Sequence, residues 1–389
     1  MKLFYLTFQE DAELYLGVTR KIKWQVRAFE ALGYDVTYTL WKNECFAFYH
    51  GSETISVPVA KGYRRMHRFS QAVLDFLNRH NFEIAYLRLD RISFDVIRIC
   101  RMLKQNGTSR VIIEIPNYPY LRDYLRSVKG VRPITRQVMT AAKALCTAAE
   151  DRISGRFLKE CADAAVLIGD KSDRFFGLPA VNITNGVNVD EFSFQRRFKN
   201  SEEIILVGVA GTLWWQAYDR VLEGMRIYRE RKKPEEPRVK FILVGGDKKE
   251  MPAFLQEVQS RGLEDDVECL GFLQGEELMR VYASADIGVS TLGCYRRGLT
   301  HCSSLKAREY CAAGLPFLYA YEDDAMEENP PFALRLPNDS SPVDISTVVA
   351  FARRCRDDPS LSEQEKEFAR QKYDWKAILE RVLVFAGAR

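Results

Sequence analysis

Residues 2–7 read KLFYLT, residues 19–32 read TRKIKWQVRAFEAL, and residues 35–40 read DVTYTL. The two short stretches are apolar runs of strand length, whereas the longer one repeats its apolar residues at helical spacing. Gly33 follows the last apolar residue of that helix, where a glycine commonly ends one. The order strand, helix, strand predicts a β-α-β unit, in which the two strands run parallel.

The same alternation continues along the whole chain. In the first half we expect helices near 63–79 and at 94–104, and strands at 84–87, 111–115, 164–168 and 181–184. The polar run 195–203 then interrupts the pattern. In the second half we expect strands at 204–210, 240–244, 267–270 and 287–289, and helices at 218–231, 252–260 and 276–283. We therefore predict an α/β protein with two Rossmann-like, doubly wound domains, residues 1–190 and 191–389, facing each other across a cleft.

Composition excludes several classes of protein. Of 389 residues, 47% are hydrophobic and 28% are charged, which is typical of an ordinary globular protein rather than a disordered or collagenous one. The 57 basic and 53 acidic residues nearly cancel, so a domain dedicated to nucleic acid is not expected. The N-terminal apolar run is interrupted by acidic residues and resembles neither a signal peptide nor a spanning helix, so we expect a cytoplasmic protein.

Cysteine and histidine usage argues against a metal centre. The nine cysteines show no C-x-x-C spacing, and only four histidines are present. Neither a disulfide framework nor a zinc site is expected from this pattern, and we interpret the cysteines as reduced, mostly buried thiols. The acidic pairs at 265–266 and 323–324 fall in polar turn segments, where solvated carboxylates are more common than metal ligands.

The densest cluster of chemically capable residues is 294–318, which reads CYRRGLTHCSSLKAREYCAAGLPFL. Ser303 or Ser304 is a suitable N-cap for a helix that runs to about residue 312, with Gly314 as its end. The N-terminus of such a helix attracts a phosphate but cannot neutralise a diphosphate alone. The cations expected to complete the site are Arg296, Arg297, Lys306 and Arg308.

Two further features of the second half each have two interpretations. Glu309 lies within the predicted helix among apolar residues, where it either forms a salt bridge or binds two ribose hydroxyls. Gly211 and the pair Gly245-Gly246 follow predicted strands, where glycine either makes a tight turn or lets the backbone approach a ligand.

Five stretches resemble one family of enzymes. They are GVTRKI at 17–22, LGYDV at 32–36, ITNGVNVDEF at 183–192, GVAGTLWW at 208–215 and, most strongly, SLKAREYCAAGLP at 304–316. With these motifs the chain resembles the retaining nucleotide-sugar glycosyltransferases of the GT-B fold, in the large family four, and most closely those that build bacterial surface polysaccharides such as capsule, O-antigen and exopolysaccharide. In that fold the last helix returns to the first domain.

The resemblance implies roles for individual residues. Glu309 resembles the ribose-binding glutamate that ends the family's Glu-x7-Glu motif, and Phe272 and Leu273 resemble its base-contacting loop. Gly17 resembles the glycine loop that approaches the diphosphate and the acceptor. The other residues expected to bind the nucleotide are Ser303, Ser304 and Leu305, at the start of the predicted helix, and Gly211, which follows the predicted strand 204–210.

Two positions depart from the family pattern. His301 stands eight residues before Glu309, where the motif has its first glutamate, and Thr212 and Gln216 replace the usual Arg and Lys after the first strand of the second domain. Diphosphate neutralisation then falls to Arg296, Arg297 or Lys306. We expect positive neighbours to keep His301 neutral, so that it either holds a hydroxyl of the donor sugar or points to solvent.

The implied reaction moves a hexosyl-type sugar, with retention, from a nucleotide-sugar to a glycan or polyprenyl-linked acceptor. It requires no metal or cofactor, since the nucleotide-sugar is the donor substrate, and its main demand is stabilisation of the departing diphosphate. Two alternatives remain open: a non-catalytic nucleotide-sugar or glycan-binding pseudo-transferase, and a GT-B nucleotide-sugar epimerase.

One segment of the first half is markedly basic. Residues 121–160 contain nine Lys or Arg and four acidic residues, interleaved with apolar ones. Such a segment either lies on an anionic membrane, making the protein peripheral on its inner face, or forms a solvated helical face.

Overall fold

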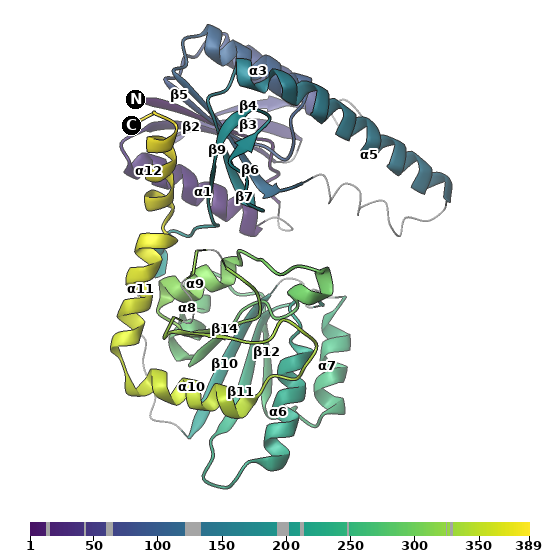
Figure 1. The fold of residues 1–389 in the computed structure, drawn as a ribbon, viewed down its shortest axis with the longest axis vertical. Helices are drawn as coiled ribbons and strands as arrows, with labels where there is room; N and C mark the ends of the chain where they lie inside the picture. The colour runs from purple at the N-terminus through teal and green to yellow at the C-terminus, as the bar shows by residue number, and fades with distance from the viewer. Residues whose placement is uncertain are drawn as a thin grey trace. The chain divides into compact units, whose positions relative to one another are not determined.

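The structure is a computed structural model, and it describes all residues except 13–15, 43, 60–64, 121–133, 193–201, 211–213, 247–248, 324 and 327–329 (Figure 1). The chain divides into two compact units. The first unit holds residues Met1–Ile183 and Trp375–Arg389, and the second holds Thr184–Asp374. The division thus falls between residues 183 and 184 rather than between 190 and 191, and the last helix belongs to the first unit.

The first unit is built on one sheet with helices on both faces. Its elements are β1 (Lys2–Thr7), α1 (Leu16–Ala31), β2 (Asp35–Lys42), β3 (Cys45–His50), β4 (Glu53–Pro58), α2 (Arg65–Leu77), β5 (Ile84–Arg88), α3 (Phe94–Gln105), β6 (Arg110–Tyr118), α5 (Ile134–Ser154), η2 (Gly155–Glu160), β7 (Ala164–Gly169), β8 (Arg174–Phe175), β9 (Leu178–Asn182) and α12 (Trp375–Phe385).

Most of these strands are parallel, as the alternation of strands and helices predicts. The strand order is β4-β3-β2-β1-β5-β6-β7-β9-β8, and β1, β2, β5, β6, β7 and β9 pair in parallel. The two edges of the sheet are antiparallel: β2, β3 and β4 form a meander at one edge, and β8 pairs antiparallel with β9 at the other. The run CFAFYH of β3 is apolar but short, and a two-residue turn leads directly into β4, so no helical pattern separates the strands.

The two faces of the first sheet differ in chemistry. Strand β1 is buried on both sides, so Phe4 and Leu6 point into an apolar core with α2 and α3, while Tyr5 and Thr7 point the other way. Helices α1 and α12 cover this second face and lie side by side in Figure 1, where α12 is drawn in yellow. The side chains buried on this face include tyrosines and charged groups.

The second unit repeats the architecture. It contains η3 (Val189–Phe192), β10 (Glu203–Ala210), α6 (Asp219–Arg231), β11 (Arg238–Gly245), α7 (Met251–Ser260), β12 (Val267–Gly271), α8 (Gly275–Ser284), β13 (Ile287–Val289), η4 (Cys294–Arg297), α9 (Leu305–Ala313), β14 (Phe317–Tyr319), β15 (Ala333–Arg335), α10 (Ile345–Asp357) and α11 (Ser360–Lys372). The sheet order is β12-β11-β10-β13-β14-β15, and every pairing is parallel. Two doubly wound α/β units are therefore present, as predicted.

The next features are the state of the cysteines and the apolar character of the helices. All nine cysteines are free thiols, and five of them are buried. Within the described residues, no helix has the length and apolar character needed to cross a bilayer.

Candidate functional site

Two loops meet at one edge of the second sheet. Strands β11 and β12 lie on one side of β10 and β13 lies on the other, so the chain changes direction across the sheet between β10 and β13. Doubly wound sheets bind ligands outside the carboxyl ends of their strands at such a switch point. Here the N–H of Leu292, after β13, donates to the carbonyl of Gln216, after β10, at 3.1 Å. Gly293 allows this contact, because a Cβ at this position would lie 2.4 Å from the carbonyl oxygen of Trp215.

The N-terminus of α9 lies in the segment that follows the β13 loop. Ser304 occupies the N-cap position with extended backbone (φ −72°, ψ 124°), but its hydroxyl makes no bond to the helix N–H groups. The hydroxyl instead accepts a hydrogen bond from Ser290 Oγ at 3.2 Å. Since the side chain does not cap α9, its first-turn N–H groups remain suited to an anion.

Ser303 has a structural role in this segment. Its hydroxyl accepts a hydrogen bond from the N–H of Asn185 at 2.9 Å and lies 2.7 Å from Thr184 Oγ1. Both contacts tie the start of α9 to the beginning of the second unit. Leu305, also predicted as a ligand contact, is the first residue of α9 and is partly buried.

Lys306 and Arg297 approach the same aromatic ring. The Nζ of Lys306 donates to Gln216 Oε1 and lies 5.5 Å from the centre of the Trp215 ring, while Cζ of Arg297 lies 5.3 Å from that ring. Burial lowers the pKa of Lys306 to about 8, although Glu309 and the thiols of Cys294 and Cys302 act in the opposite direction. The structure thus brings together two of the predicted cations.

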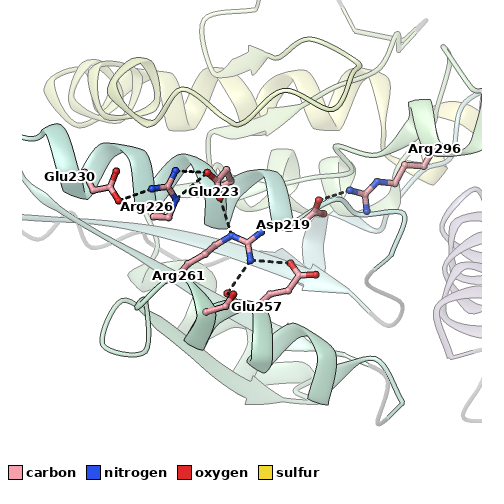
Figure 2. A network of polar contacts seen from close by, with 8 residues as sticks. Asp219, Glu223, Arg226, Glu230, Glu257, Arg261 and Arg296 are labelled. Atoms are coloured by element: carbon pink, nitrogen blue, oxygen red, sulfur yellow. Dashed lines mark hydrogen bonds and ion pairs between the residues drawn. The ribbon is translucent and has the colours of Figure 1, made fainter.

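Arg296 is held in an ion pair. Its Nη2 lies 2.5 Å from Asp219 Oδ2, and its Nη1 donates to the carbonyl of Trp214. Figure 2 shows Asp219 on α6, where Glu223 forms a separate set of ion pairs with Arg226 and Arg261. The charge of Arg296 is therefore matched by Asp219 within the unit, and its role on a diphosphate stays a prediction.

Arg308 and two of the acidic residues, Asp323 and Asp266, are buried in ion pairs rather than exposed. The Arg308 guanidinium is fully buried and forms a two-point ion pair with Asp323, one contact being Nη2 to Oδ1 at 2.8 Å. Asp323 therefore matches the charge of Arg308 inside the unit. Asp323 and Asp266 were expected to be solvated, but both are buried, and Asp266 Oδ1 lies 2.5 Å from Arg238 Nε.

The neighbour of His301 is acidic, which corrects the expectation of positive charge around it. Its Nε2 lies 3.0 Å from Glu322 Oε2, and the two backbones form an isolated parallel bridge. The imidazole is more than half exposed. The interaction is therefore an exposed hydrogen-bonded pair, with Arg335 on the other oxygen of Glu322 at 3.3 Å.

Glu309 on α9 and the loop after β12 also belong to the second unit. Glu309 is partly buried, and its Oε2 accepts a hydrogen bond from Tyr282 OH of α8 at 3.1 Å. Phe272 follows β12 and is 66% exposed, as a side chain available for stacking would be, and Leu273 beside it is partly buried. Tyr282 gave no signal in the sequence, because its partner lies 27 residues away.

Some predicted residues lie outside the site or outside the described chain. Gly17 belongs to the first turn of α1 rather than to a loop, and a Cβ there would meet no atom within 4 Å. Gly211 and Thr212 lie outside the described residues. In the part of the chain that is described, no three His, Cys, Asp or Glu side chains gather as a metal site requires.

The basic segment 121–160 is only partly described. Residues 121–133 lie outside the described residues, and the remainder forms α5 and η2. Along α5, Met139 and Leu145 are 73% and 64% exposed. Exposed apolar and basic side chains therefore alternate on this helix, where Lys143 and Arg152 are also exposed.

One comparison with known proteins matches the part of the second unit that contains the β10 and β13 loops. Residues 189–320 match the family model described as "Glycosyl transferases group 1", and this range includes the β10 and β13 loops and α9. No curated protein sequence matches the chain.

Solved structures resemble the chain over its whole length. They include a sucrose-phosphate synthase from Thermosynechococcus elongatus, with a TM-score of 0.62 and 15% identity, covering 100% of this chain and 99% of that one. The catalytic domain of starch synthase IV from Arabidopsis thaliana, bound to ADP and acarbose, has a TM-score of 0.58 and 11% identity with 100% and 99% coverage. An alpha,alpha-trehalose-phosphate synthase (UDP-forming) from Burkholderia vietnamiensis has a TM-score of 0.55 and 12% identity, with 100% coverage of both chains.

The fold is GT-B. The paired doubly wound units and the full-length likeness to these structures confirm the predicted fold class. Identities of 11–15% establish a shared fold and leave the reaction to be argued from the residues.

Proposed function

We propose that the protein is a retaining glycosyltransferase that moves a hexosyl-type sugar from a nucleotide-sugar donor to a glycan or polyprenyl-linked acceptor in cell-surface polysaccharide synthesis. The observation that carries this proposal is the meeting of Lys306, Arg297 and the uncapped N-terminus of α9 at the β10/β13 switch point. The match of residues 189–320 to a glycosyl transferase family supports it.

The chemistry asked of this site is electrostatic. When the bond between sugar and diphosphate breaks, negative charge grows on the departing oxygen. The amides of α9, the ammonium of Lys306 and the guanidinium of Arg297 would stabilise that charge. In this scheme Glu309 accepts the ribose hydroxyls, Phe272 and Leu273 meet the base, and His301 contacts the donor sugar.

Measurement of nucleoside diphosphate release tests the proposal. Thermal shifts against a panel of nucleoside diphosphates and their sugars first select the donor. Slow release of the diphosphate from that donor, abolished in Lys306→Ala and retained in Lys240→Ala, would support a transferase, because Lys240 pairs with Glu203 at the surface. Binding without release across acceptors would favour the pseudo-transferase, and conversion of the free nucleotide-sugar into its epimer would favour the epimerase.

We also propose that the enzyme works at the inner face of the cytoplasmic membrane, to which the 121–160 segment binds. The basic balance of this segment and the exposed Met139 and Leu145 on α5 support this proposal. Each basic residue near an anionic surface contributes about 1 kcal/mol, so the attraction depends on salt.

A further inference from the structure

Gln216 lies at the β10/β13 switch point of the second unit and is almost fully enclosed, with 2% of its surface exposed. Its amide oxygen accepts two hydrogen bonds, one from Thr291 Oγ1 at 3.1 Å and one from Lys306 Nζ. An ammonium can only donate, so it is the oxygen of the amide that faces Lys306. Because Thr291 follows β13 and Lys306 is in the first turn of α9, this one side chain joins three segments of the site.

The backbone next to Gln216 is held in a conformation that most residues avoid. Ala217 has φ +55° and is fully buried, although its Cβ disfavours this left-handed region. The carbonyl of Gln216 accepts the N–H of Leu292, and a Cβ at Gly293 would lie only 3.0 Å from Ala217 Cβ. Such strain persists where the surrounding structure over-determines it, and it is concentrated at functional sites. The fold therefore fixes the position of Gln216 at a cost in backbone energy.

Lys306 keeps its positive charge beside this amide. None of the carboxylates in the described part of the chain forms an ion pair with Lys306, which is only partly buried. The oxygen of Gln216 carries a partial negative charge, but the amide as a whole is neutral. The contact therefore orients the ammonium without cancelling its charge.

The pKa of Lys306 reflects these surroundings. Burial lowers it to about 8, while Glu309 on the same helix and the thiols of Cys294 and Cys302 act in the opposite direction. Arg297 adds a second cation, which faces the same aromatic ring as Lys306. The ammonium thus loses its proton close to pH 8, where the effect of a changed neighbour can be measured.

We propose that Gln216 is a positioning residue of the transfer reaction, which holds the Lys306 ammonium through a neutral acceptor and so leaves its full charge for the diphosphate of the donor. This inference rests on the proposed function. A carboxylate in the place of the amide would hold the ammonium but would cancel its charge. An apolar side chain would leave the charge but would not hold the ammonium.

Binding of inorganic pyrophosphate tests the inference without any transfer reaction. Pyrophosphate is titrated into the full chain by calorimetry between pH 7 and pH 10, and release of nucleoside diphosphate is measured separately. We expect Gln216→Glu to weaken pyrophosphate binding at pH 7 by about tenfold or more, although it keeps the size of the side chain and both hydrogen bonds. Gln259→Glu is the matched control, because it makes the same change at an exposed position on α7.

The pH profile distinguishes positioning from a merely structural role. In the parent protein, pyrophosphate affinity should fall as pH rises through about 8, where Lys306 loses its proton. Gln216→Glu should move this fall to higher pH, because a negative neighbour favours the ammonium. Gln216→Met should move it to lower pH, because the ammonium loses its acceptor. Ionisation of pyrophosphate itself is common to all three proteins and cancels in the comparison.

Three results would overturn the inference. They are pyrophosphate binding by Gln216→Glu within twofold of the parent, a fall in affinity at the same pH in Gln216→Met as in the parent, and absence of pyrophosphate binding to the parent. If Gln216→Glu fails to fold, the pH profile of Gln216→Met decides. Failure of the proposed transferase function would appear differently, as the expected pyrophosphate results without diphosphate release from any nucleotide-sugar.

Discussion

Arg308 of α9 and Asp323 form a two-point ion pair in which neither side chain reaches solvent. The Arg308 guanidinium also lies 4.2 Å from the centre of the Tyr373 ring. Arg308 Nη2 also donates to Ser303 Oγ at 3.2 Å, so these contacts hold α9 close to its N-terminus, beside Lys306.

The first prediction follows from this pair. Asp323→Asn should lower the free energy of unfolding by about 3–5 kcal/mol, because a buried guanidinium is left without its counter-charge. Urea unfolding followed by circular dichroism measures the change. The double variant Arg308→Met/Asp323→Leu should lose less stability than Asp323→Asn, since both charges are removed together. A loss below about 1 kcal/mol for the single variant would show that the pair contributes little.

Glu309→Gln should weaken nucleoside diphosphate binding by about 1–3 kcal/mol, because a charged acceptor of ribose hydroxyls is replaced by a poorer one. Calorimetry on the folded variant decides this. Tyr282→Phe is the matched comparison, since it removes the hydrogen bond at 3.1 Å and leaves the carboxylate in place. Unchanged nucleotide affinity in Glu309→Gln would assign Glu309 a structural role with Tyr282.

Lys306→Met should reduce turnover more than donor binding, since charge on the leaving group grows in the transition state. The same change should stabilise the fold at neutral pH. The pKa of Lys306 is about 8 in the folded protein and 10.5 when unperturbed, so between these values the unfolded chain binds more protons. The parent protein therefore gains stability from this group as pH rises from 8 to 10.5.

The free energy of unfolding of the parent protein and of Lys306→Met, measured across pH, isolates this effect. The stability advantage of Lys306→Met should be largest below pH 8, at most about 3 kcal/mol, and should shrink as pH rises toward 10.5. Contributions from Lys21 and the buried tyrosines cancel in the difference. A stability advantage of Lys306→Met that does not change with pH would contradict the lowered pKa of Lys306.

His301→Ala should lower sugar transfer and leave nucleoside diphosphate affinity within about 0.5 kcal/mol, because the contacts proposed for the base, ribose and phosphates involve other residues. Transfer kinetics with the true donor and calorimetry separate the two effects. Glu322→Gln provides a control, since it alters the partner 3.0 Å from Nε2 and keeps the imidazole. Transfer by His301→Ala at the parent rate would exclude a sugar contact.

The 121–160 segment should bind anionic vesicles in flotation assays, and binding should weaken as salt shortens the screening length from about 10 Å at 0.1 M. The variant Met139→Glu/Leu145→Glu should reduce recovery, because both exposed apolar side chains are replaced by acids. Equal recovery with neutral and anionic vesicles would argue for a solvated helical face.

The sequence by itself determined many of the strands and helices and their order, but it did not indicate the β3–β4 hairpin. The apolar runs of β1 and β10 and the helical repeat of α1 are local patterns, so each could be predicted within a few residues of its bounds. The start of α9 after Ser304 and its end at Gly314, with φ +63°, also follow from residues within one turn.

Only the tertiary structure decided which charges meet. Asp219 lies 77 residues from Arg296, and Asp323 lies 15 residues beyond Arg308 across a loop and a strand, so no spacing in the sequence pairs them. Arg88 and Glu114 face each other because β5 and β6 are neighbours in register, which periodicity does not specify. Strand and helix patterns repeat over a few residues, whereas the partner of a buried charge is set by strand order and register across the whole sheet.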